Sequence, residues 1–459
     1  MSVFPQNIKT AAKNTIAMSV PIAIGRIAGN LAGVIGMLMV AHLGHMQLAA
    51  SALVNSILMA VVFSVLSIVF SVGVLVGFFY GANEFAKIGG VVQQGFILSI
   101  VLGIPTMLIL WYIAPILLLF KQEPHLVTLT QDFLRGYAWG IIPNFFAATL
   151  LQFATGISKQ KLVTVYNIVI LPILVGFGYV LIFGKFGMPK LGMRGMGYAY
   201  SISFIVVTVV MILHFYFFKE YRQYKLFTWK KLIDFEYLRK LFDIGWPIST
   251  MLAAELLVFS MSTVLVGWLG EASLAAQQIT LQINVLVIMI PYSIAMATTI
   301  LISQEMGRKK HENIRLLGVV GTVLGIFGTI LFAVFYLLTP KFLISFFLDV
   351  TNSANLPTIK IATTLLAIAI LMNILDSVKT IFTCALRGLS DTVYPMIVNI
   401  ILSCFMSLPI GYLLAFPLHM GVVGIRLGFV VGFLIGAILL MRRFYKFSDV
   451  NFLMHYKRI

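Results

Sequence analysis

Long apolar runs constrain this chain more than any other feature of its sequence. Runs of about 20 or more mainly apolar residues recur along the whole length, and each could cross roughly 30 Å of hydrocarbon as a helix. Of the 459 residues, 60% are hydrophobic and only 10% are charged, which is too few polar side chains to cover a soluble protein. The sequence therefore predicts an all-α polytopic membrane protein.

The distribution of basic residues predicts the topology. The net charge is +17, and Lys and Arg gather in the segments that would be cytoplasmic if the N-terminus lies inside. We therefore expect a multi-pass protein of a bacterial inner membrane with both termini cytoplasmic, no cleavable signal and no nucleic-acid partner. The twelve predicted spans lie at roughly 15–40, 47–80, 91–118, 127–157, 162–184, 192–217, 243–268, 274–305, 315–338, 355–386, 393–414 and 421–444.

The second half of the sequence repeats the first. Shifted by 226 positions, residues 21–81 fall on residues 247–307 without a gap, so that Pro21 meets Pro247 and Gly81 meets Gly307. Each half holds six predicted spans, an even number, so both halves enter the bilayer in the same orientation. We predict two six-helix bundles related by a pseudo-two-fold axis along the membrane normal. The expected boundaries are an N-terminal lobe at 1–217, a basic cytoplasmic linker at 218–242 and a C-terminal lobe at 243–459.

Charged residues inside spans are the candidates for function, because a charge is costly in the membrane. Glu255 lies in the seventh span, where the first copy has Gly29, and Asp376 lies in the tenth. A carboxyl group in apolar surroundings can bind a proton or a small hard cation, which is what ion-coupled transport requires. The alternative is a static ion pair with Lys379 or Arg26 that ties helices together.

Lys379 follows Asp376 by three residues, so both lie on one helix face and can pair. The ammonium group would compete with Na⁺ for the carboxylate, which favours a proton-switched pair. Glu255 and Asp376 would be metal ligands only if transport is Na⁺-coupled. The alternative for Lys379 is a side chain that reaches toward the interface without a coupling role.

A substrate cavity is predicted between the two halves. Arg26 could attract an anion or neutralise an acid, although a structural arginine is the alternative. Gln278 and Gln282 share a face of the eighth span and could contact substrate or bond to neighbouring helices. The predicted cavity residues are Arg26, Asn30, Gly36, Asn144, Asn167, Gln278 and Gln282.

Other chemistry is disfavoured by the sequence. It contains no Walker motif and no nucleophile elbow, and its seven His are dispersed. Cys384 and Cys404 both fall in apolar segments, so a structural disulfide is not expected. We expect neither an enzyme nor a bound cofactor.

Several short motifs follow one another in a specific order along nearly the whole chain. They are Pro247-x7-Glu255, Trp268-Leu269-Gly270, Leu274-Ala275-Ala276-Gln277-Gln278-Ile279, Asp376 followed by Ala385-Leu386-Arg387-Gly388, and the glycine-rich run Gly184–Gly192. This order resembles the NorM-like branch of the multidrug and toxic compound extrusion (MATE) family. The resemblance implies two bundles of six helices around a V-shaped cavity, and export driven by entry of H⁺ or Na⁺.

The resemblance also implies site residues, with three departures. The cation-binding acids of the family's second half correspond to Glu255 and Asp376. The first-half acid of NorM-like members would fall at Gly36, and the glutamine usual three residues after the tenth-span acid is Lys379. The Asp or Asn that often follows the fifth-span Asn167 is also replaced, by Leu171 or Pro172. We therefore expect coupling to run through the second half alone.

Two kinds of substrate remain open on the sequence. The resemblance implies an amphipathic organic cation, whereas the intramembrane Arg26 and Lys379 and the missing acid at Gly36 suit an anionic or zwitterionic metabolite. A lipid-linked precursor flippase is a further alternative, which the few intramembrane cations disfavour. The expected partners are a small organic solute and membrane lipid, with the protein functional as a monomer.

Overall fold

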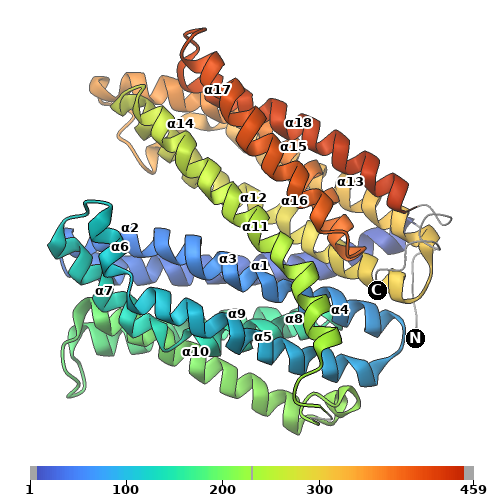
Figure 1. The fold of residues 1–459 in the computed structure, drawn as a ribbon. Coiled ribbons are helices and arrows are strands. Elements are labelled where there is room, and N and C mark those ends of the chain that lie inside the picture. Colours follow the sequence, from blue (N-terminus) through green and yellow to red (C-terminus); the bar gives the residue numbers. More distant parts are fainter. Residues whose placement is uncertain (1–7, 229–230, 449–459) are drawn as a thin grey trace. The chain divides into compact units, whose positions relative to one another are not determined.

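The structure is a computed structural model that describes residues 8–228 and 231–448. Every regular element in these two ranges is a helix (Figure 1). Eleven of the described helices are long and apolar enough to cross a membrane. The predicted all-α polytopic fold is therefore confirmed.

The predicted span at 127–157 differs in detail. The structure divides it into α7 (Pro124–Ala138) and the shorter apolar helix α8 (Ile141–Gly156). The break falls at Gly140, where an added Cβ atom would lie 2.6 Å from the Cα atom of Ser201 on α10. The chain turns where the two helices approach closely, which the hydrophobic pattern does not report.

Backbone conformation supports the sequence duplication. Residues at equivalent positions in the two halves adopt positive φ angles where one helix ends and the next begins. Asn83 and Lys309, separated by 226 positions, have φ angles of 59° and 60°. The further pairs are Gly44 with Gly270, Ser158 with Ser390, and Gly192 with Gly421. The repeated sequence thus encodes repeated turns as well as repeated spans.

Contacts between residues divide the chain into two compact units. The first-half unit is Ile24–Ser249, and the second-half unit comprises Met1–Ala23 together with Thr250–Ile459. The first-half unit contains the later part of α1 (Ile8–Ala41), α2 (His45–Ile57), the π-helix η1 (Leu58–Phe63), α3 (Ser64–Leu66), η2 (Ser67–Val69), α4 (Phe70–Gly81), α5 (Phe85–Trp111), α6 (Ala114–Leu119), α7, α8, α9 (Gln160–Phe183), α10 (Gly192–Phe217), η3 (Lys219–Tyr224) and the start of α11 (Phe235–Gly267).

The second-half unit contains the start of α1 and the remainder of α11. Its other elements are α12 (Glu271–Gly307), α13 (His311–Leu338), α14 (Pro340–Ser345), η4 (Ser353–Asn355), α15 (Leu356–Gly388), α16 (Val393–Ile400), the π-helix η5 (Ile401–Ser407), α17 (Leu408–Ala415) and α18 (Gly421–Phe447).

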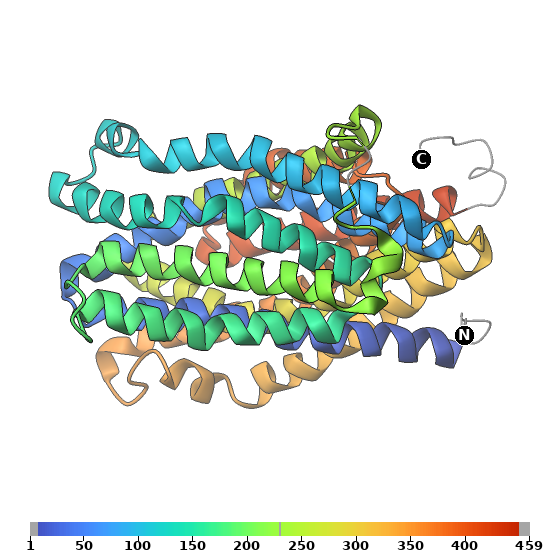
Figure 2. The ribbon, with the colours of Figure 1, turned by 90° about the horizontal axis from the view of Figure 1, so that it is seen from below.

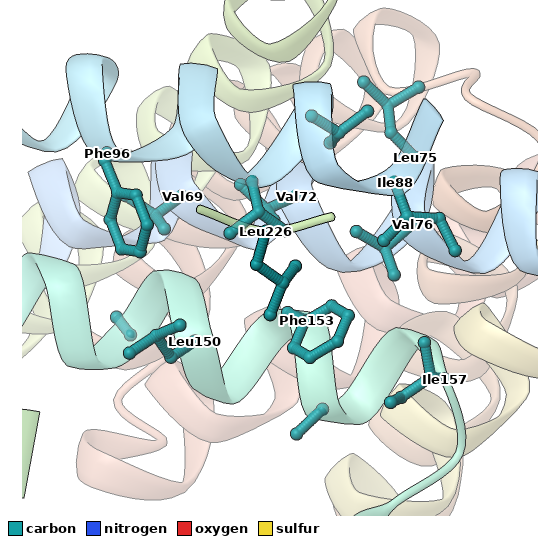
Figure 3. Close-up of a cluster of buried hydrophobic side chains, with 14 of the residues drawn as sticks. Val69, Val72, Leu75, Val76, Ile88, Phe96, Leu150, Phe153, Ile157 and Leu226 are labelled. Atoms are coloured by element: carbon teal, nitrogen blue, oxygen red, sulfur yellow. The ribbon is translucent and has the colours of Figure 1, made fainter. Parts of the chain in front are cut away.

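The first-half unit is held together by apolar side chains between α4, α5 and α8. Phe153 on α8 is fully buried and lies among Val72, Val76 and Ile88 (Figure 3). Each aromatic side chain of this kind removes about 150–250 Å² of apolar surface from its surroundings. In the same unit α9 and α10 pack along their length, which Figure 2 shows in green.

The boundaries of the units differ from the expected ones at two places. Gln93 on α5 donates hydrogen bonds to the carbonyl oxygens of Leu226 (3.0 Å) and Thr228 (3.1 Å), so the expected linker packs on the first-half unit. At the other end, Ala11 and Met18 of α1 are buried in the same apolar cluster as Phe444 of α18. The start of α1 therefore belongs to the second-half unit instead of the N-terminal lobe.

Candidate functional site

Three charged side chains meet inside the second-half unit. The Nζ atom of Lys379 on α15 lies 3.2 Å from Asp376 Oδ1 and 3.4 Å from Glu255 Oε1 on α11. Asp376 reaches the lysine because the two residues are one helical turn apart. Glu255, which is 124 residues earlier in the chain, reaches it only because α11 and α15 belong to the same bundle.

Lys379 is held in place by α18. Its side chain is only 8% exposed, and its Nζ atom lies 4.2 Å from the centroid of the Phe433 ring. The aliphatic stem lies against the backbone of Gly436 one turn further along α18. An ammonium group over an aromatic face is stabilised by the ring quadrupole. The lysine therefore lies between the two acids and does not reach toward an interface.

The charges of this group determine what it can bind. The carboxylates of Glu255 and Asp376 are 31% and 22% exposed, so both retain some access while the ammonium is buried. With both acids ionised the group has a net charge of −1, and uptake of one proton makes it neutral. A small cation that binds between the two carboxylates would therefore have to displace or oppose the ammonium of Lys379.

A second polar cluster lies beside this group. Asn284 Oδ1 on α12 accepts hydrogen bonds from Asn373 Nδ2 (2.8 Å) and from the hydroxyl of Tyr336 on α13 (2.9 Å). Asn373 precedes Asp376 by three residues on α15, so the two side chains share a face. The sequence prediction named none of these three residues. One sequence signal could have identified this cluster. Gln277 and Asn284 lie seven residues apart, which places both amide side chains on one face of α12.

The predicted glutamines of α12 lie on a different face. Gln278 and Gln282 are both exposed, as expected from their shared spacing, whereas the neighbouring Gln277 is buried and donates to Thr263 Oγ1 at 3.3 Å. A contact of Gln278 and Gln282 with substrate remains a prediction.

The predicted cavity residues of the first half all lie in the first-half unit. On α1, Asn30 is exposed and donates a hydrogen bond to the carbonyl oxygen of Arg26, which is half-buried. Asn167 on α9 packs against Gly25, and Asn144 is half-buried on α8. Since the predicted set is divided between the two units, a shared substrate cavity remains a prediction.

Comparison with known proteins identifies the family. The MatE family model matches residues 21–180 and 247–413, so both halves of the duplicated chain are covered. This chain belongs to the MatE family. The family comprises MATE transporters, so the resemblance predicted from the sequence is confirmed.

Relatives and solved structures of the MatE family match almost the whole chain. Two proteins named "Probable multidrug resistance protein NorM" are similar to it. The one from Synechococcus sp. is 27% identical, covering 97% of this chain and 96% of that protein. The one from Mesorhizobium japonicum is 29% identical, covering 96% of this chain and 95% of that protein.

Two solved structures show the same fold. An outward-facing multidrug resistance MATE family transporter of the MOP superfamily superposes with a TM-score of 0.86 at 17% identity, covering 98% of this chain and 100% of that one. The eukaryotic MATE transporter AtDTX14 superposes with a TM-score of 0.83 at 20% identity, covering 97% of this chain and 99% of that one.

The position where NorM-like members of the MatE family carry a first-half acid is filled by neighbours. Gly36 is buried, and an added Cβ atom would lie 2.4 Å from the Cε atom of Met196 and 3.1 Å from the hydroxyl of Tyr200, both on α10. A side chain at Gly36 would therefore point into the space that the end of Met196 occupies. The space beside Gly36 is therefore occupied by the side chain of Met196.

We expect the two positions to be coupled in folding. Gly36→Asp alone should cost about 1–3 kcal/mol, because Met196 must turn away from the new carboxyl group. Met196→Ala provides the missing space, so the double variant should be more stable than the sum of the single effects predicts, by more than about 0.5 kcal/mol. Apparent melting temperatures of the four purified proteins test this expectation. Simple additivity would mean that the two side chains do not share the site.

Proposed function

We propose that this protein is a proton-coupled antiporter that exports organic solutes by alternating access. The observation that carries the proposal is the position of Lys379 between Glu255 and Asp376. Because the lysine supplies one positive charge permanently, uptake of a single proton neutralises the group. Na⁺ is the less favoured coupling ion, because the ammonium already occupies the position between the two carboxylates.

Exchange would follow from a difference in affinity between two states. In the state open to the outside, the Glu255–Asp376 group takes up a proton and substrate leaves. In the state open to the inside, the proton is released and the negative group favours binding of the next substrate. The two ligands are coupled only to the extent that their affinities differ between the states.

The substrate class is proposed from the relatives and from the charge of the site. The names of the NorM relatives refer to multidrug resistance, which supports export of amphipathic organic cations. A net charge of −1 at the unprotonated group also favours a cation. The second candidate is an anionic or zwitterionic metabolite, favoured by the cationic Arg26 of α1 and by Gly36, where no acid is present.

The location follows from the class of protein. We propose a bacterial inner membrane with both termini cytoplasmic, as the distribution of Lys and Arg favours. The two lobes would form the substrate cavity between them, and one chain would suffice for transport.

The test is efflux of a fluorescent organic cation from proteoliposomes under an imposed pH gradient or an imposed Na⁺ gradient. We expect a response to the pH gradient alone, and we expect Glu255→Gln to reduce that response at least about tenfold, because one of the two acids of the proposed coupling group is lost. The control is Glu271→Gln, which removes an exposed carboxylate at the start of α12. Glu271→Gln should transport as the wild type does.

Three outcomes would contradict parts of the proposal. Full pH-driven efflux by Glu255→Gln would remove Glu255 from coupling. A response to the Na⁺ gradient alone would mean that Lys379 moves away during the cycle. If neither gradient drives the organic cation, the same assay with anionic substrates tests the second candidate.

A further inference from the structure

An arginine is buried inside the second-half unit without a hydrogen-bond or ion-pair partner in the described part of the chain. Arg426 lies near the start of α18 and is 4% exposed. Its Nε and Nη2 atoms are buried and make no hydrogen bond within residues 8–228 and 231–448, and no acid of these ranges forms an ion pair with it. It lies inside the predicted span 421–444 and is not among the candidate residues that the sequence predicts.

A buried guanidinium group of this kind needs a ligand. Arginine does not lose its proton in proteins, so it cannot become neutral as a buried lysine or carboxyl group can. Burying an unpaired charge is costly, and buried N–H donors are nearly always hydrogen-bonded. Water would satisfy the N–H groups of Arg426 but would leave its charge uncompensated. An anion would satisfy both.

The position of Arg426 follows from contacts along α18. Phe433 contacts Lys379 of α15, and Phe444 packs on Phe382 of the same helix with ring centroids 5.5 Å apart. Residue numbers therefore rise together on α15 and α18, and the two helices run parallel. Arg426 precedes Phe433 by seven residues, which places its Cα atom about 10 Å nearer the start of α18 on the same helix face.

Aromatic rings separate Arg426 from the charged group at Lys379. Phe429, one turn after Arg426, stacks on Phe259 of α11 with centroids 5.7 Å apart and an interplanar angle of 10°. Side chains on a helix lean toward its N-terminus, so the guanidinium points further from Phe433. Arg426 and Lys379 are therefore two separate cationic positions in one bundle.

The groups that face Arg426 leave it without a negative partner. The helices that pack on α18 are α15, α16, η5 and α17, and the one acid on these four elements, Asp376 of α15, contacts Lys379. On α11, Glu255 lies one turn before Phe259, which stacks on Phe429, and it also contacts Lys379. On its own helix Arg426 is followed on the same face by Val430 and Phe433, which belong to the apolar core.

We propose that Arg426 binds a small inorganic anion, chloride, inside the second-half unit. The fork of N–H donors supplies the hydrogen bonds, and the apolar surroundings strengthen the attraction between the anion and the guanidinium. When the Glu255–Asp376–Lys379 group has taken up a proton and is neutral, the charge of Arg426 remains in this bundle. A bound anion would offset that charge. The anion site is inferred from the burial of Arg426 alone, so it stands whichever substrate or coupling ion the protein uses.

The test measures binding of chloride to the purified full-length protein. The apparent melting temperature is compared in chloride and in gluconate at equal ionic strength. At chloride about 100-fold above its dissociation constant, we expect the wild type to melt about 5 °C higher than in gluconate. Arg426→Gln should lose this difference, and Arg426→Lys, which keeps the charge but not the fork, should retain part of it.

The control is Arg387→Gln in the same bundle. Arg387 is also buried, but its Nη1 atom lies 3.9 Å from the sulfur of Met296. This variant should keep the difference between chloride and gluconate even if it melts at a lower temperature. A wild-type protein with equal stability in both salts would overturn the proposal, as would an undiminished chloride effect in Arg426→Gln.

A direct measurement decides the case in which Arg426→Gln does not fold. Equilibrium binding of ³⁶Cl⁻ to the wild type should saturate at about one ion per chain and should be competed by bromide. Absence of saturable binding would mean that water alone fills the site, which would overturn the proposal.

Discussion

Lys379→Met is expected to convert the Glu255–Asp376 pair into a Na⁺-binding site. In the native group each carboxylate has an oxygen within 3.4 Å of the Lys379 Nζ atom. Without the ammonium, the two acids repel each other unless one holds a proton or both share a cation. Methionine fills a similar volume against Phe433 and Gly436, so the packing of α15 on α18 should be retained.

The expected effect on stability is large. Removing one partner of a buried ion pair costs about 3–5 kcal/mol, and we expect the lower end because both carboxylates are partly exposed. For a unit of this size that corresponds to a fall of about 6–12 °C in apparent melting temperature in a Na⁺-free buffer. Added Na⁺ should restore several degrees in Lys379→Met and none in the wild type.

A double variant provides the control for the Na⁺ effect. Lys379→Met combined with Glu255→Gln retains a single acid. The melting temperature of this double variant should therefore be the same in Na⁺ as in an equal concentration of a bulky organic cation. If Lys379→Met itself ignores Na⁺, the two carboxylates do not converge on one cation, and the lysine has a structural role only.

Gly197→Ala is expected to disrupt the packing of α7 on α10 in the first-half unit. A Cβ atom at Gly197 would lie 2.2 Å from the carbonyl oxygen of Phe133 and 2.9 Å from the backbone nitrogen of Tyr137. Gly136 faces it across the contact, so two small residues let the helices approach closely, as is common in membranes. Both atoms belong to the backbone, so the helices must separate to admit even a methyl group.

The expected loss is about 2–3 kcal/mol, which is a fall of roughly 5–10 °C in apparent melting temperature. Gly176→Ala on α9 is the matched control, because nothing lies within 4 Å of its added Cβ atom. That change should be neutral or slightly stabilising, since alanine favours a helix interior by about 1 kcal/mol over glycine. Equal melting temperatures for the two variants would mean that α7 and α10 do not pack as closely as the structure has them.

The sequence determined the features that depend on neighbouring residues. Apolar runs long enough to cross a membrane predicted the helices, and the sequence repeat accounts for equivalent turns such as those that the structure shows at Asn83 and Lys309. The pairing of Asp376 with Lys379 could also be predicted, because a spacing of three residues in a helix fixes their relation without knowledge of any other element.

Tertiary structure decided the features that depend on which helix faces which. The hydrophobic pattern does not report that α11 brings Glu255 to Lys379, or that Met196 fills the space beside Gly36. It also leaves open which face of α12 is buried: Gln277 and Asn284 are buried, whereas the predicted cavity residues Gln278 and Gln282 are exposed. Most helices of this chain are apolar on most faces, so the rotation of each helix about its own axis is set by packing against its neighbours. This packing decides whether an arginine such as Arg426 is buried inside a bundle or lies at the membrane interface.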